Sequence, residues 1–87
     1  MNILEIVIEE NNIVLLFEKD GKVIDEKKWN EKNDLSRRLL SEIDRMQKNN
    51  KTAIDKVEVV SDISEKFTTV RIAKTVAKAF NFAISQD

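Results

Sequence analysis

The side chains with the most chemistry to offer in this sequence are carboxylates. Acidic residues in or beside its first apolar stretches are Glu5, Glu9, Glu10, Asp25 and Glu26. Carboxylates that converge in space hold divalent metal ions and support phosphodiester hydrolysis. Glu5 is the best candidate, but two or three acidic partners would have to reach it from later elements that this chain lacks. We therefore favour Glu5 as an exposed strand residue.

The composition excludes most other reactive sites. The 87 residues contain no His and no Cys, which removes the commonest general base, the commonest metal ligand and any thiol chemistry. No residues have the spacing of a metal-ligand motif. One Gly and no Pro leave no Gly-rich loop that could cradle a phosphate. We expect no catalytic residue, no metal and no cofactor, and hence no enzyme.

Length predicts a single domain over residues 1–87. The absence of cysteine, and of a membrane span or signal peptide in the opening stretch, leads us to expect a cytoplasmic protein. Fifteen basic and sixteen acidic residues nearly cancel, which argues against direct nucleic-acid binding. A row of Arg71, Lys74 and Lys78 is interpreted as a solvated face, with an electrostatic site for an acidic partner or tRNA phosphate as the alternative. The opening apolar run is too short for a membrane span and lacks the basic flank of a signal peptide.

The first third of the chain is expected to form β-strands. Branched apolar residues predict strands at Asn2–Ile8 and Ile13–Lys19. Asp20-Gly21 predicts a tight hairpin to a third strand, Lys22–Trp29, whose charges suit a sheet edge. The stretch 53–61 predicts a fourth, with Val57 and Val59 on one side and Val60 on the other.

Two helices follow from apolar residues at helical spacing. Asp34 is the expected N-cap of the first, which runs to about Lys48 with Leu35, Leu39, Ile43 and Met46 along one stripe. Its mixed charges, among them Glu42, are interpreted as solvated. Asp62 or Ser64 is expected to cap the second helix, which reaches about Ile84.

This order, βββαβα, predicts an α/β (α+β) fold. A crossover helix allows the fourth strand to run parallel to the first, so the four-stranded sheet is mixed. Both helices lie mainly on one face. The first two strands are apolar on both sides, which indicates cover on both faces. The second face is therefore partly exposed or covered by something else, such as a second copy.

The stretch KFTTVRIAKTVAKAF, from Lys66 to Phe80, carries a family resemblance. It resembles the pattern SFTGLRIGLATAKGLA of the TsaB (YeaZ) family, and LSRRLLSEID resembles that family's HSERLLPLID. The matching residues of the first stretch are Phe67, Thr68, Arg71, Ile72, Ala77 and Lys78. The resemblance implies the N-terminal half of an actin-like, ribonuclease-H-like domain, truncated and divergent.

Departures from the family pattern concern its phosphate-binding features. Val7 stands where the family's first strand has Asp, and SDISEK replaces GPGS before the second helix. Without Gly, and with Asp62 and Glu65 nearby, we expect no anion site at the start of that helix.

The resemblance also implies a function. Family members are non-catalytic, and they pair through their first two helices with themselves or with TsaD, a subunit of the tRNA threonylcarbamoyladenosine machinery. We accordingly expect a homodimer or a complex with a TsaD-like protein. The alternatives are a minimal ribonuclease-H-like nuclease or nucleotide-binding protein, and a fragment without a partner. The expected partner interface is Leu39, Leu40, Ile43, Ile72, Val76, Ala79, Phe82 and Ala83.

Overall fold

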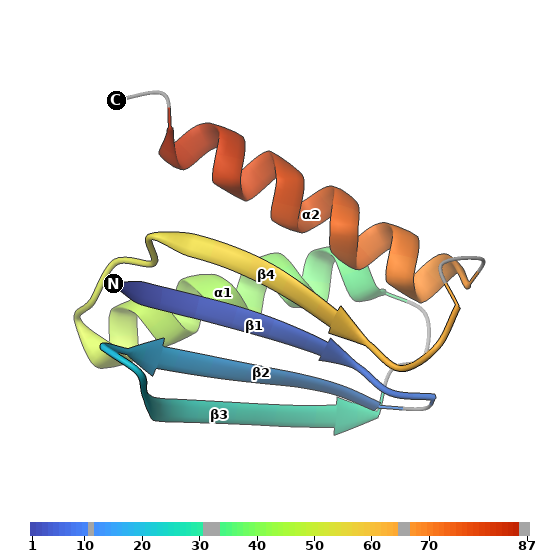
Figure 1. The fold of residues 1–87 in the computed structure, drawn as a ribbon, viewed down its shortest axis with the longest axis horizontal. Coiled ribbons are helices and arrows are strands. Elements are labelled where there is room, and N and C mark those ends of the chain that lie inside the picture. Colours follow the sequence, from blue (N-terminus) through green and yellow to red (C-terminus); the bar gives the residue numbers. More distant parts are fainter. Residues whose placement is uncertain (11, 31–33, 65–66, 86–87) are drawn as a thin grey trace.

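The computed structural model describes residues 1–10, 12–30, 34–64 and 67–85. Its element order is the predicted βββαβα (Figure 1). Glu65 and Lys66, which belong to the expectations above, lie outside the described residues. The elements are β1 (Asn2–Ile8), β2 (Asn12–Lys19), β3 (Lys22–Asn30), α1 (Leu35–Asn50), β4 (Lys56–Ser61) and α2 (Thr68–Ile84).

The four strands form one mixed sheet in the order β3-β2-β1-β4. β2 pairs antiparallel with both β1 and β3, and β4 pairs parallel with β1. The predicted mixed sheet and the predicted edge position of β3 are therefore confirmed. β4 forms the opposite edge, because α1 carries the chain across the sheet between β3 and β4 (Figure 1).

The hairpin between β2 and β3 has the tight turn that its sequence predicts. Asp20 has φ 50° and Gly21 has φ 86°, and positive values at both central residues match the twist of the flanking strands. The N-terminal ammonium group donates a 2.8 Å hydrogen bond to the Asp20 carboxylate. This hydrogen bond raises the pKa of the terminal amine and lowers that of Asp20.

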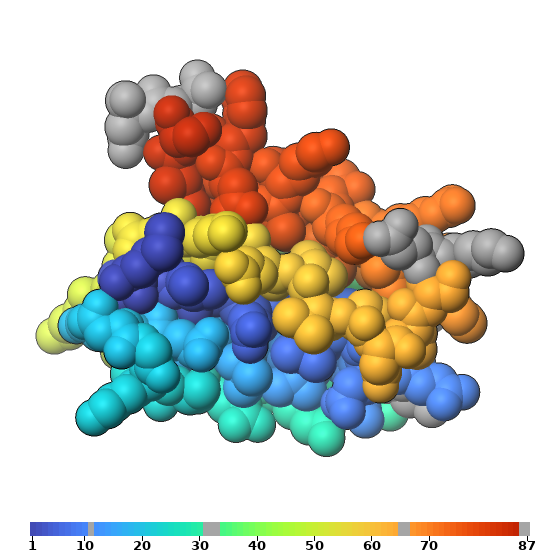
Figure 2. Space-filling view, in the orientation of Figure 1, coloured from blue at the N-terminus to red at the C-terminus, as the bar shows by residue number. Residues whose placement is uncertain are grey.

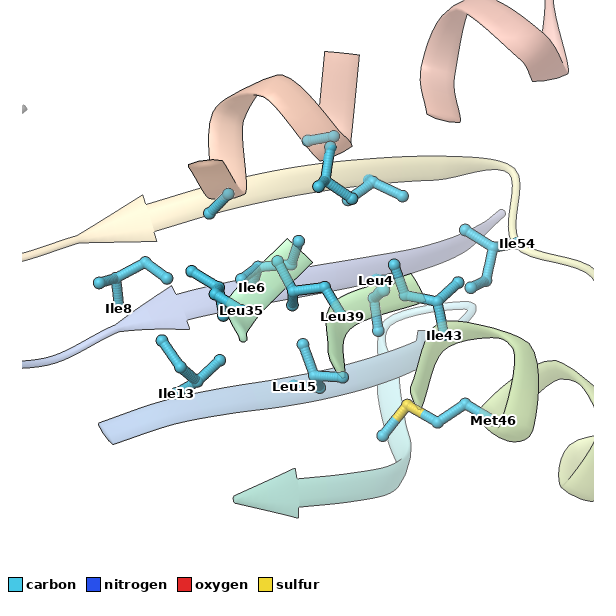
Figure 3. Packing of buried hydrophobic residues seen from close by; sticks show 14 of the residues in the cluster. Leu4, Ile6, Ile8, Ile13, Leu15, Leu35, Leu39, Ile43, Met46 and Ile54 are labelled. Atoms are coloured by element: carbon cyan, nitrogen blue, oxygen red, sulfur yellow. The ribbon is translucent and has the colours of Figure 1, made fainter. Parts of the chain in front are cut away.

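One face of the sheet carries the core. Leu4, Ile6 and Ile8 alternate with less buried residues along β1, so alternate side chains point toward the helices. Figure 3 shows them beside Leu39 and Ile43 of α1. The buried cluster also includes residues of β2, β4 and α2, namely Ile13, Leu15, Phe17, Val57, Val70, Ala73, Val76 and Ala77.

The helix ends differ partly from expectation. Asp34 occupies the N-cap position of α1, but its side chain makes no capping hydrogen bond. The prediction that Asp62 or Ser64 caps α2 is wrong, because the N-cap position is Phe67. The Phe67 carbonyl accepts a 3.3 Å hydrogen bond from the Arg71 N–H, so the helix begins where its backbone bonding begins rather than at the preceding polar residues.

The second face of the sheet has no helix of this chain in front of it. Figure 2 shows side chains of the strands at the surface there. We call this the open face. By register and alternation its described residues are Ile3, Glu5, Val7, Asn12, Val14, Leu16, Glu18, Val23, Glu26, Lys28, Asn30, Lys56, Glu58 and Val60.

Candidate functional site: the outer surface of the two helices

The eight residues expected at a partner interface divide into core and surface. Leu39 and Ile43 are buried within this chain's own core, and so is Val76. Ile72 is half-buried. The exposed members are Leu40, Ala79, Phe82 and Ala83. Leu39 and Leu40 face different environments, as expected for residues about 100° apart on a helix.

Four of these residues follow one side of α2. Ala79 is three residues before Phe82, four before Ala83 and two turns after Ile72, so the four side chains are neighbours on the helix surface. Phe82 is 66% exposed and Leu40 is 54% exposed. We call Leu40, Ile72, Ala79, Phe82 and Ala83 the helix-pair surface.

Leu40 belongs to this surface because α1 lies alongside α2. Ser36 of α1 lines an open hollow of about 220 Å³ together with Ile72 and Val76 of α2. Leu40 is one turn after Ser36, so it lies on the same side of α1, toward α2. The apolar residues of the two helices can therefore contact one partner together.

A second hollow lies near the C-terminal ends of both helices. It measures about 410 Å³, and Gln47 of α1 and Phe80 of α2 contribute to its lining. Ala83 of the helix-pair surface lies at its rim. The junction of the two helices is thus concave near both of its ends.

Basic side chains border the helix-pair surface. Arg71, Lys74 and Lys78 are all exposed, in agreement with the predicted row on one side of α2. Arg71 also lines the hollow beside Ile72. A partner that covers the apolar residues would therefore meet positive charge along one border.

Asn81 has a role that sequence reasoning missed. Its side-chain carbonyl accepts a 2.8 Å hydrogen bond from the Val57 N–H, and its amide donates a 2.9 Å hydrogen bond to the Val57 carbonyl. These two bonds occupy the outer backbone groups of edge strand β4 as another strand would. Nothing in the helical pattern identifies this contact, since it joins residues 24 positions apart.

Glu42 corrects the expectation of a solvated charged face on α1. Its side chain is only 3% exposed and forms ion pairs with Arg38 and Arg45, both at 3.3 Å. Lys27 of β3 lies 3.9 Å away. The Arg38 guanidinium also lies 5.0 Å from the Trp29 ring centroid. The spacing of Glu42 from both arginines was a visible signal of ion pairing, but its burial depends on β3.

Glu5 has acidic neighbours, contrary to expectation. It pairs with Glu58 across β1 and β4, and Glu18 is opposite Ile3, two residues before Glu5. Burial raises the pKa of the Glu5 carboxyl, and the charges of Glu18 and Glu58 raise it further. All three lie on the open face, away from both helices.

Neither a cluster of metal ligands nor a membrane-spanning helix occurs among the residues that the structure describes. Within that part of the chain, no group of three or more acidic residues is arranged to hold a metal ion. Likewise, none of its helices is long and apolar enough to cross a membrane.

Comparison with solved structures identifies a similar fold. YeaZ from Pseudomonas aeruginosa superposes with a TM-score of 0.79 over 97% of this chain, at 18% sequence identity. The chain has a TsaB-like fold. No protein-family model and no curated protein matches the sequence. The predicted fold class is thereby confirmed.

This chain corresponds to less than half of the YeaZ chain. This chain covers 40% of the YeaZ chain, so the activity and partners of a TsaB-like protein remain proposals here. The predicted half-domain over residues 1–87 and the predicted interface stay predictions. Those predicted interface residues that are not buried in this chain's own core form the helix-pair surface.

Proposed function

We propose that this chain is a non-catalytic, cytoplasmic protein-interaction module that pairs through its two helices. The partner is a second copy or a TsaD-like subunit of the tRNA threonylcarbamoyladenosine machinery. The observation that carries the proposal is the helix-pair surface, on which Leu40 and Phe82 are more than half exposed. The TsaB-like fold supports the choice of partner.

The energetics favour this surface for association. Complete burial of a leucine or phenylalanine side chain contributes about 1.5–3 kcal/mol. Ala79 and Ala83 are exposed on the same side of α2, and their small side chains would allow a partner helix to approach closely. Leu40 and Phe82 then serve as anchors at the two sides of this contact.

Light scattering over a range of protein concentrations tests self-pairing. We expect a dimer that Leu40→Glu and Ala79→Glu convert to monomer, because each places a charge in an apolar contact. Ser41→Glu is the matched control, since Ser41 is exposed on α1 and lies about 100° away from Leu40 around the helix. Equal weakening by Ser41→Glu would contradict the assignment of this surface.

If the chain stays monomeric at high concentration, self-pairing is excluded and a TsaD-like protein is the remaining candidate partner. Pull-down with a purified TsaD-like protein should then capture the wild-type chain and the Ser41→Glu variant but not Leu40→Glu. Failure to capture the wild-type chain, together with a monomeric state, would refute the proposed function.

A further inference from the structure

The open face has an apolar band across its middle strands. Val7 pairs with Val14 of β2 and with Val60 of β4, so the three valines form a row across three strands. Val60 is 46% exposed. Strands that are apolar on both sides are normally covered on both faces. The core covers only the opposite side here, where α1 lies behind the sheet and α2 packs against α1 and β4.

The adjacent row on this face is acidic. Glu5 pairs with Glu58 of β4 and with Leu16 of β2, which in turn pairs with Glu26 of β3. Lys56 forms a 3.2 Å ion pair with Glu58, but carboxylates outnumber ammonium groups among the described residues of the face. The acidic members are Glu5, Glu18, Glu26 and Glu58, and the basic members are Lys28 and Lys56.

Binding along the sheet edges is less favourable than binding on this face. Asn81 occupies the outer backbone groups of Val57 on β4. β3, at the other edge, carries four consecutive charged side chains, Asp25 to Lys28, which discourage pairing with another strand. An additional element therefore fits over the sheet better than beside it.

We propose that the open face binds a basic amphipathic helix of a partner protein. Its apolar side would cover Val7, Val14 and Val60, and its Lys or Arg side chains would lie over the acidic row. The dimensions agree, because three neighbouring strands span about 10 Å, which is the diameter of a helix with its side chains. Burial, and then repulsion by Glu18 and Glu58, raises the pKa of Glu5, and these cations would relieve the repulsion.

Amide chemical-shift mapping on the complete ¹⁵N-labelled chain tests this proposal. The probes are two synthetic 15-residue helical peptides with the same leucine stripe, one with lysines and the other with glutamates at the polar positions. The lysine peptide should shift amides of β1, β2 and β4. The glutamate peptide should bind at least roughly tenfold more weakly, because its charges are repelled by the acidic row to which the lysines are attracted.

Two matched variants locate the charge effect. Glu58→Lys should weaken binding of the lysine peptide roughly tenfold. Asp44→Lys makes the same change in charge at an exposed residue of α1 and should alter binding less than about twofold. The spectra also report whether each variant is folded. Leu40→Glu should leave peptide binding intact, so this test is independent of pairing through the helix-pair surface.

Several results would overturn the proposal. These are equal binding of the two peptides, shifts confined to α1 and α2, and no shifts at millimolar peptide. Concentration-dependent shifts on the open face without peptide would also overturn it, because a second copy would then be the occupant.

Discussion

Substitution of Asn81 by alanine should destabilise this chain more than its half-buried surface position suggests. Asn81 is bonded to both the N–H and the carbonyl of Val57, and Val57 is only 2% exposed. Alanine leaves both backbone groups without this partner. It also uncovers part of the β4 edge, so the variant should aggregate more readily.

The expected loss follows from the two unpaired groups. Each buried donor or acceptor that loses its partner costs about 1–3 kcal/mol. Alanine is the better helix former by about 0.6 kcal/mol, which offsets part of the loss. These values give a net decrease of about 1–5 kcal/mol in the free energy of unfolding. We expect about 2–3 kcal/mol, because Asn81 is only half-buried and water can reach the freed groups, out of a total of about 4–13 kcal/mol for a chain of this length. The melting temperature should fall by roughly 10–20 °C.

Urea and thermal unfolding monitored by circular dichroism measure this effect. Asn49→Ala is the matched control, because Asn49 is an exposed residue of the other helix. Asn81→Asp adds a second comparison, since an ionised carboxylate accepts the Val57 N–H but cannot donate to its carbonyl. Relative to wild type, Asn81→Asp should recover stability as pH falls and the carboxyl becomes a donor. A loss for Asn81→Ala no larger than for Asn49→Ala would refute this reasoning.

Three further changes test other parts of the structure. The pKa of Glu5 is raised above its ordinary 4.5 by burial and by Glu18 and Glu58, so its ionisation destabilises the folded chain as pH rises through the folded-state pKa. Glu5→Gln should therefore increase the urea midpoint at pH 7 and lose this advantage below pH 4.5; an unchanged difference across that range would contradict the assignment. Glu42→Gln removes the negative charge that pairs with Arg38 and Arg45. It should lower the free energy of unfolding by about 1–2 kcal/mol, a modest loss because these arginines are about half exposed and stay hydrated. An effect below about 0.5 kcal/mol in urea titrations would mean that the ion pairs are not stabilising. Lys51→Gly should raise the melting temperature, since Lys51 ends α1 at φ 50°, a left-handed conformation that costs an L-residue with a Cβ about 1–2 kcal/mol; a lower melting temperature would show that the lysine side chain is needed.

Local patterns in the sequence predict most of the secondary structure. The Asp20-Gly21 pair identifies the hairpin because few other residue pairs adopt positive φ twice in succession. Apolar residues on both sides of β1 and β2 predict a sheet with two apolar faces, and the spacing of Leu35, Leu39 and Ile43 identifies the buried side of α1. Each of these signals depends on neighbours within a few positions.

The tertiary structure decided which distant residues meet. A helical period places Asn81 on α2 close to the direction of buried Val70, but only the position of α2 beside β4 places it against Val57. Glu42 is buried because α1 packs beside β3, and Glu5 meets Glu58 because β4 runs parallel to β1. These contacts join residues far apart in the chain, so local propensity and spacing carry no information about them. The sequence by itself therefore determined the elements and their apolar sides, while packing decided which polar groups those elements bury.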